Sequence, residues 1–89
     1  MTEVKIEKLS EEELRSKGVF EWPIWQKEVS RFDWHYDIQE ECYILEGKVK
    51  VETGTGDVEF QAGDFVTFPS GMDCIWEIKE NVRKHYSMG

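Results

Sequence analysis

Two side chains with possible acid–base or nucleophilic chemistry lie in segments that read as strands, Glu40 and Cys74. A carboxyl group enclosed by apolar residues can donate or accept a proton, provided that no cation pairs with it. Glu40 fits that role, but it can equally be held by Tyr36 or a nearby lysine, or point outward. Cys74 becomes a nucleophile only if a neighbouring base or cation favours its thiolate. A cysteine in such a strand is more often a small core residue.

The segment 32–37 decides which groups surround Glu40. Phe32, Trp34 and Tyr36 alternate with polar residues, so one face of a strand is aromatic and the other polar. Each ring buries roughly 150–250 Å² at about 25 cal/mol per Å², so burying the aromatic face is favoured by several kcal/mol. We therefore predict that Trp34 and Tyr36 line an interior pocket and that His35 faces outward.

The opposite orientation of this strand would give a metal site instead. Asp33 and His35 would then join Glu40 and Cys74, and these four groups are plausible ligands for zinc or iron. A dimer interface that covers the aromatic face would permit this arrangement. Our primary prediction is a site without a metal, and the metal site is the alternative.

Two residues near the end of the chain complete the predicted site. Trp76 shares the inward side of its strand with Cys74, because the two are separated by one residue. His85 would supply a base if it pointed inward, although the alternation of residues 82–86 leaves its side undecided. We predict Glu40 and Cys74 as catalytic residues, and Trp34, Tyr36, Trp76 and His85 as substrate-binding residues.

Short strands separated by turns must position these side chains. Ser10 and Glu13 form a capping box before a short helix at 11–17, and Gly18 is expected to end it. Gly47 predicts a tight turn or a bulge. The remaining pattern predicts strands at 4–8, 32–36, 40–46, 48–53, 58–61, 65–68, 74–78 and 82–86, with an extended segment at 22–25. This favours an all-β sandwich or closed barrel with one short N-terminal helix.

The turn spacing resembles the two motifs of the cupin superfamily over residues 32–78. Glu40 is followed after six residues by Gly47, and Gly63 after five residues by the segment 69–71, with Cys74 three residues beyond it. The resemblance implies a small jelly-roll barrel. Metal-binding cupins use two histidines and a glutamate from the first motif and a histidine from the second. Here Cys74 takes the place of the second-motif histidine, and the first motif has no His-x-His.

Four shorter segments resemble one subgroup of small cupins. They are Trp-Pro-x-Trp at 22–25, Phe-x-Trp-x-Tyr at 32–36, Tyr-x-Leu-Glu-Gly at 43–47 and Lys-His-Tyr at 84–86. This subgroup includes the cupin modules of ureidoglycine aminohydrolase and of ethanolamine-utilisation proteins. The resemblance implies a small polar ligand that often contains nitrogen.

Composition limits the class of protein. The chain has 89 residues and a net charge of -8, so we expect one domain that spans 1–89 and binds neither nucleic acid nor a membrane. No apolar run is long enough to span a bilayer, and the N-terminal sequence lacks the pattern of a leader. Two cysteines in apolar surroundings suit reduced thiols. We expect a cytoplasmic protein.

Three functions remain open from the sequence. The first is a jelly-roll protein that binds a small polar molecule in an aromatic pocket, without metal or cofactor, whether or not it is an enzyme. The second is a metal-dependent enzyme that uses His35, Glu40 and Cys74. The third is a structural or dimerisation module, in which the strand at 4–8 pairs with a second copy.

Overall fold

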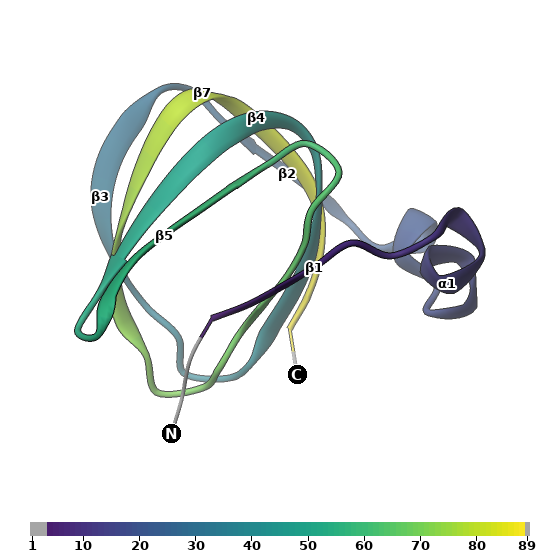
Figure 1. Cartoon of the computed structure of the whole chain (residues 1–89), viewed down its shortest axis with the longest axis horizontal. Helices are drawn as coiled ribbons and strands as arrows, with labels where there is room; N and C mark the ends of the chain where they lie inside the picture. The colour runs from purple at the N-terminus through teal and green to yellow at the C-terminus, as the bar shows by residue number, and fades with distance from the viewer. Residues whose placement is uncertain (1–3, 89) are drawn as a thin grey trace.

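The chain folds into one connected seven-stranded antiparallel sheet, which bends into two facing halves around a common core (Figure 1); these halves are called the two sheets below. The computed structural model describes residues 4–88. Its elements are β1 (Lys5–Glu7), α1 (Glu11–Ser16), a 3-10 turn (Val19–Glu21), β2 (Ile24–Lys27), β3 (Ser30–His35), β4 (Glu40–Thr53), β5 (Gly56–Gln61), β6 (Phe65–Phe68) and β7 (Asp73–Met88). This confirms the prediction of an all-β fold with one short helix near the N-terminus.

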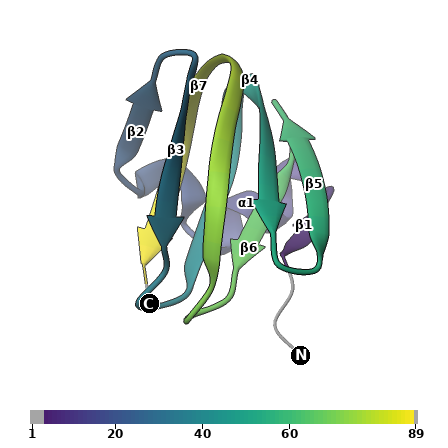
Figure 2. The ribbon, with the colours of Figure 1, turned by 90° about the vertical axis from the view of Figure 1, so that its left-hand side faces the viewer.

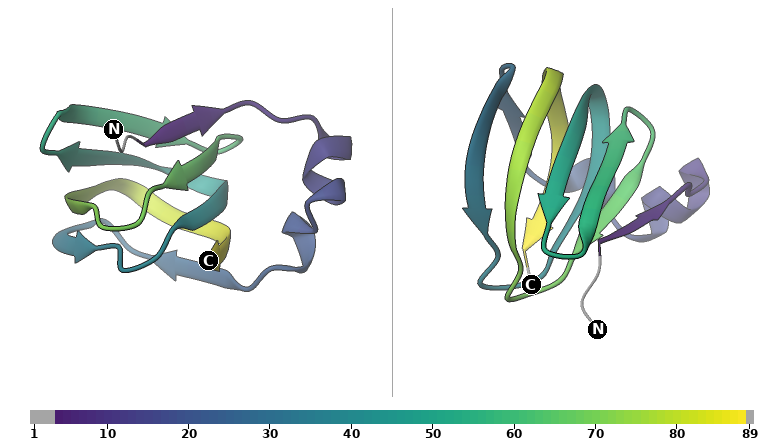
Figure 3. Two further views of the ribbon diagram at one scale, coloured as in Figure 1. Left: turned by 90° about the horizontal axis from the view of Figure 1, so that it is seen from below. Right: turned by 60° about the vertical axis from the view of Figure 1, so that its left-hand side comes forward.

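Two long strands, β4 and β7, connect the sheets. Their outer ends, Glu40–Ile44 and Lys84–Met88, pair with each other, and this half of the barrel continues through β6 and β1 on one side and β2 on the other. The other halves of the same two strands pair with each other and with β5 and β3. Figures 2 and 3 show β4 and β7 side by side, with β3 beside β7 and β5 beside β4. Each long strand therefore contributes to both sheets.

The sequence suggested that residues 40–46 and 48–53 are separate strands, and likewise 74–78 and 82–86. In the structure each pair is one continuous strand that bends. The register of β4 against β7 shifts between Ile44 and Val49, so Gly47 marks a bulge and not a turn. Gly47 has φ +101°, and a Cβ there would lie 2.5 Å from the carbonyl oxygen of Asn81. The two strands therefore bend where their backbones approach most closely.

The N-terminal segment covers the outside of one sheet. Ser10 accepts a hydrogen bond from the backbone N–H of Glu13, whose carboxylate accepts from the backbone N–H of Ser10, so the predicted capping box is present. Gly18 follows with φ +76°, the predicted left-handed cap. Leu14 then packs with Val19 and Phe65 in a small cluster outside the barrel.

The strand predicted at 4–8 is present as β1, which pairs with β6 of the same chain. The possible homodimer stays a prediction. Over residues 4–88, no helix combines the length and the apolar composition that crossing a membrane requires.

The main core lies between the two sheets and is largely aromatic. Trp76 stands at its centre, with ring centroids 5.7 Å from Phe60 and 5.6 Å from Phe68. Phe68 stacks on Tyr36 at 4.8 Å. Aromatic contacts of this kind contribute about 0.5–1.5 kcal/mol each beyond the burial of area. The core thus provides a rigid wall for the adjoining cavity.

Candidate functional site

In the segment 32–36 the structure buries Tyr36, packs partly buried Phe32 against the core and leaves Trp34 exposed at the edge of the core. Tyr36 is 1% exposed, and Trp34 lines the mouth of an internal cavity with 48% of its surface exposed. His35 points away from the barrel interior, toward Asp37 and Asp73. The cavity therefore forms on the aromatic side of β3.

The cavity has a volume of about 250 Å³ and opens on one side of the barrel. Its walls come from β2, β3, β7 and the two residues Tyr36 and Glu40 near the start of β4. Aromatic side chains form most of the lining, and among residues 4–88 Glu40 and Lys84 carry the only charges in it. The lining residues are Trp25, Phe32, Trp34, Tyr36, Glu40, Trp76, Lys84, Tyr86 and Met88. This cavity is the candidate functional site.

A buried ion pair forms the polar part of the lining. The Lys84 ammonium donates to Oε2 of Glu40 at 2.6 Å, and the two side chains are 5% and 6% exposed. The same ammonium lies 4.9 Å from the ring centroid of Trp25 and 4.6 Å from that of Trp76. Glu40 was predicted either to act as an acid or base or to be held by a neighbour such as a lysine. The structure shows that Lys84 holds it.

Tyr36 adds a hydroxyl group beside this pair. Burial raises the pKa of Tyr36 well above its usual value, and the negative charge of Glu40 raises it further. The hydroxyl therefore keeps its proton and can donate a hydrogen bond. Oε2 of Glu40 accepts from Lys84, and the Tyr36 hydroxyl also interacts with the Glu40 carboxylate, so Tyr36, Glu40 and Lys84 together form the polar part of the lining.

Cys74 is buried in the core but does not line the cavity. Its thiol donates to the backbone oxygen of Trp34 at a sulfur–oxygen distance of 3.7 Å. Burial raises the pKa of Cys74 to about 11. The thiol is thus protonated at neutral pH, and its surroundings match the core interpretation given above.

Trp76 lines the cavity from the centre of β7, on the inward side that the sequence predicted. Its indole nitrogen is fully buried and has no hydrogen-bond partner within the described residues. The ring faces the Lys84 ammonium and packs against Phe32 with an interplanar angle of 18°. Trp76 therefore joins the core to the charged part of the cavity.

His85 lies on the other face of β7 and is not brought to the cavity. It is 8% exposed, and its Nδ1 lies 2.9 Å from the backbone oxygen of Trp22. Its ring also meets Phe20 edge to face at a centroid distance of 6.0 Å. His85 thus helps to attach the N-terminal segment to the barrel, while its neighbours Lys84 and Tyr86 line the cavity.

The side chains of the predicted alternative metal site do not converge. Glu40 faces the cavity, whereas His35 faces outward, with Nδ1 2.6 Å from Asp73 and Nε2 3.3 Å from Asp37. Among residues 4–88, no three His, Cys, Asp or Glu side chains are arranged to hold a metal ion. The positions that correspond to the cupin ligands provide the Glu40 carboxylate, which is paired with Lys84, and the Cys74 thiol, which does not line the cavity. These residues do not fit the metal that the fold family implies.

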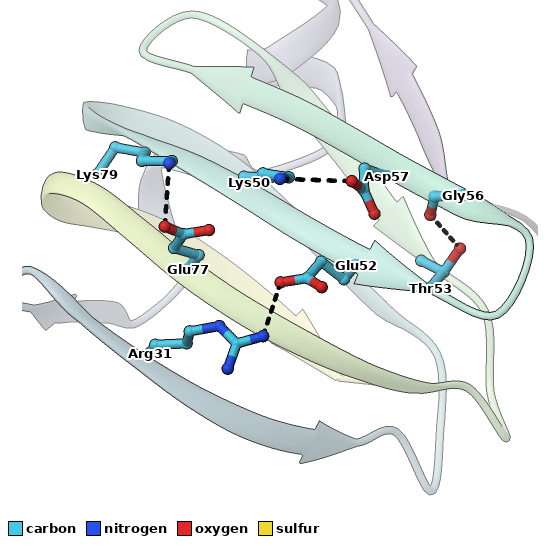
Figure 4. A network of polar contacts seen from close by, with 8 residues as sticks. All are labelled: Arg31, Lys50, Glu52, Thr53, Gly56, Asp57, Glu77 and Lys79. Atoms are coloured by element: carbon cyan, nitrogen blue, oxygen red, sulfur yellow. Dashed lines mark hydrogen bonds and ion pairs between the residues drawn. The ribbon is translucent and has the colours of Figure 1, made fainter.

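The outer face of the sheet carries positively and negatively charged side chains that form ion pairs (Figure 4). Arg31 pairs with Glu52 at 3.0 Å, and Lys50 pairs with Asp57 at 3.4 Å. These side chains lie on β3, β4 and β5, on the face opposite the aromatic rings. The polar residues of the strand pattern thus face the solvent.

Five lining residues were not among the predicted site residues: Trp25, Phe32, Lys84, Tyr86 and Met88. Lys84 and Tyr86 share one face of β7 with buried Val82, so the alternation of residues 82–86 contained the signal. It remained undecided because placing His85 inside was an equally regular alternative. One consideration favours Lys84 over His85 on the inner side of the strand: a buried Glu40 needs a neighbouring cation.

Known proteins match this chain over most of its residues. The model of the EutQ-like cupin domain family matches residues 14–86. A DUF861 family protein from Thermotoga maritima is 56% identical, with 98% of this chain and 100% of that chain covered and a TM-score of 0.95. No match was found among the curated proteins.

Two EutQ proteins share the fold at lower identity. A putative ethanolamine utilization protein Q from Salmonella typhimurium is 25% identical over 73% of this chain and 53% of that chain, with a TM-score of 0.67. The EutQ protein of Clostridium difficile is 18% identical over 73% and 52%, with a TM-score of 0.68. The present chain therefore corresponds to about half of each EutQ protein.

Proposed function

Because the chain belongs to the EutQ-like cupin domain family, we propose that it uses its barrel to bind a small uncharged organic molecule, without a metal. The observation that carries this proposal is the aromatic cavity with the Glu40–Lys84 pair in its lining. Ligand sites are typically apolar hollows with a few polar groups that fix orientation. The cavity has this composition, and its polar groups come from Tyr36, Glu40 and Lys84.

The size of the cavity limits the ligand. A volume of about 250 Å³ lies just below the roughly 300–1,000 Å³ that is common for drug-sized ligands. The walls include the flat faces of Trp25, Phe32 and Trp76, which favour a planar or ring-shaped molecule. A single planar group with one polar substituent fits these limits.

Charge favours a neutral ligand. The Glu40–Lys84 pair is itself neutral, so a ligand with a net charge would bring an uncompensated charge into a buried site. The net charge of -8 also opposes the approach of anions. A cation would compete with Lys84 for the faces of Trp25 and Trp76. The polar substituent therefore forms its hydrogen bond with Glu40 or Tyr36 while remaining uncharged.

A binding experiment with paired variants tests this proposal. Uncharged aromatic and heteroaromatic compounds, including benzyl alcohol, are screened by thermal shift against the parent protein and Trp34→Ala. Trp34 is 48% exposed at the cavity mouth, so its removal takes away one wall without emptying the core. We expect compounds that stabilise the parent protein to lose most of that effect in Trp34→Ala.

The matched control is Val29→Ala. Val29 is also an exposed apolar residue, at 59%, but it does not line the cavity. Stabilisation by the same compounds is expected to be unchanged in this variant. A screen in which no compound stabilises the parent protein, or in which Trp34→Ala responds like Val29→Ala, contradicts the proposal.

A further inference from the structure

From the placement of Lys84 we infer that the cavity captures small uncharged aldehydes or ketones covalently, as a protonated imine on Nζ of Lys84. This inference rests on the proposed function, because it names the chemical class of the ligand in the same cavity. Lys84 lines the cavity although its side chain is only 5% exposed. A primary amine that borders an apolar cavity can react with a carbonyl group once its proton has been transferred to a neighbouring base.

The neighbours of Lys84 provide for the proton transfers of this reaction. Oε2 of Glu40 lies 2.6 Å from Nζ, so the ammonium proton can pass along one hydrogen bond to the carboxylate. Nζ is then a neutral amine whose lone pair attacks the carbonyl carbon while the C=O π bond breaks. One of the two amine protons moves to the carbonyl oxygen, which becomes the hydroxyl group of a carbinolamine. The protonated Glu40 returns its proton to that hydroxyl group, which leaves as water.

The reaction leaves the charges of the site unchanged. One carbonyl compound and the Lys84 ammonium give one iminium ion and one water molecule. The positive charge stays at Nζ, the negative charge stays on Glu40, and no oxidant or reductant is required. Trp25 and Trp76 already face this charge at 4.9 Å and 4.6 Å, so both rings continue to stabilise it in the iminium.

The other lysines lack this combination. Lys50 and Lys79 also pair with carboxylates, Asp57 and Glu77, but they lie on the open outer face shown in Figure 4. A carbonyl compound has no enclosing wall there, and water competes for the amine. These two residues therefore serve as internal controls for the reactivity of Lys84.

Reductive trapping on the full chain tests the inference. The protein is incubated with limiting benzaldehyde and sodium cyanoborohydride, which reduces an iminium to a stable amine, and the modified residue is located by peptide mass mapping. We expect a mass shift of one benzyl group at Lys84 before Lys50 or Lys79 is modified. Benzyl alcohol, which cannot form an imine, is expected to slow this modification by occupying the cavity.

Variants and a binding measurement separate the possible outcomes. Lys84→Arg keeps a cation beside Glu40 but cannot form the imine, so the early adduct is expected to be lost. Modification of Lys50 and Lys79 with Lys84 unmodified overturns the inference, and this result needs only the parent protein. Tryptophan fluorescence then reports benzyl alcohol binding. Binding without an adduct at Lys84 rejects covalent capture and leaves the proposed function intact, whereas neither binding nor adduct rejects both.

Discussion

Replacing Glu40 by Gln tests whether the buried pair is a coupled unit. Both side chains are almost fully buried, so the variant leaves the Lys84 ammonium without a counter-ion in the barrel. Breaking such a pair usually costs about 3–5 kcal/mol. The glutamine oxygen can still accept one hydrogen bond, and Trp25 and Trp76 still face the cation, which retains about 0.5–2 kcal/mol. We therefore expect a loss near the lower end, about 3 kcal/mol.

A double-mutant cycle isolates the coupling. Urea denaturation is measured for the parent protein, Glu40→Gln, Lys84→Met and the variant with both changes. Removing both charges together leaves neither one stranded, so the double variant should lose about 2–3 kcal/mol less than the sum of the single variants. In thermal melts, a loss of 3 kcal/mol corresponds to a lowering of the midpoint by about 12–24 °C for a domain of this size.

The matched control is the Glu52→Gln variant on the outer face. Glu52 pairs with Arg31 at 3.0 Å, but both side chains are accessible to water, at 32% and 57% (Figure 4). The same chemical change there should leave the urea midpoint nearly unchanged. The reasoning is refuted if Glu40→Gln and Lys84→Met add within about 0.5 kcal/mol, the tolerance expected of independent sites.

Three further predictions concern the rest of the barrel. Gly47→Ala should destabilise the protein by at least about 2 kcal/mol in urea, because it combines backbone strain with a clash against Asn81. Gly54→Ala, where no atom lies near the added Cβ, should cost less than about 0.5 kcal/mol. Equal losses in the two variants would disprove the close approach of Asn81 to Gly47. Burial raises the pKa of Cys42 from 9.0 to about 12, so its stabilising contribution is complete below pH 9 and is lost as the pH rises toward 12. Urea midpoints across this pH range should fall less steeply in Cys42→Ala, and an unchanged slope would remove the thiol from the explanation. Ser10→Ala should cost about 1 kcal/mol by removing the helix cap, and a midpoint equal to that of the parent protein would show that the cap contributes nothing.

The orientation of β3 could be predicted because one physical effect outweighs the others. Burying the ring of Tyr36 and partly burying that of Phe32 is worth several kcal/mol, whereas His35 gains little from burial without a partner. The capping box at Ser10 and Glu13 is a local signal that requires no tertiary information. The turn spacing around Gly47 and Gly63 indicated the family, and the family model confirms it over residues 14–86.

The continuity of the long strands could not be predicted from local patterns. Gly47 interrupts the alternation of β4 in the same way as a tight turn, and only the approach of Asn81 from β7 shows that it is a bulge. The partner of Glu40 was also hidden. Lysine is among the residues least often buried, and Lys84 is 44 positions away along the chain. Its placement depends on the pairing of β4 with β7.

A crystal structure of the protein soaked with benzyl alcohol tests the central claim most directly. The account predicts one molecule inside the cavity, with its ring between the aromatic walls of Trp34 and Trp76 and its hydroxyl group within hydrogen-bond distance of Glu40 or Tyr36. The Glu40–Lys84 pair should remain intact. Benzyl alcohol bound only on the outer surface, with the cavity filled by core side chains, would contradict the account.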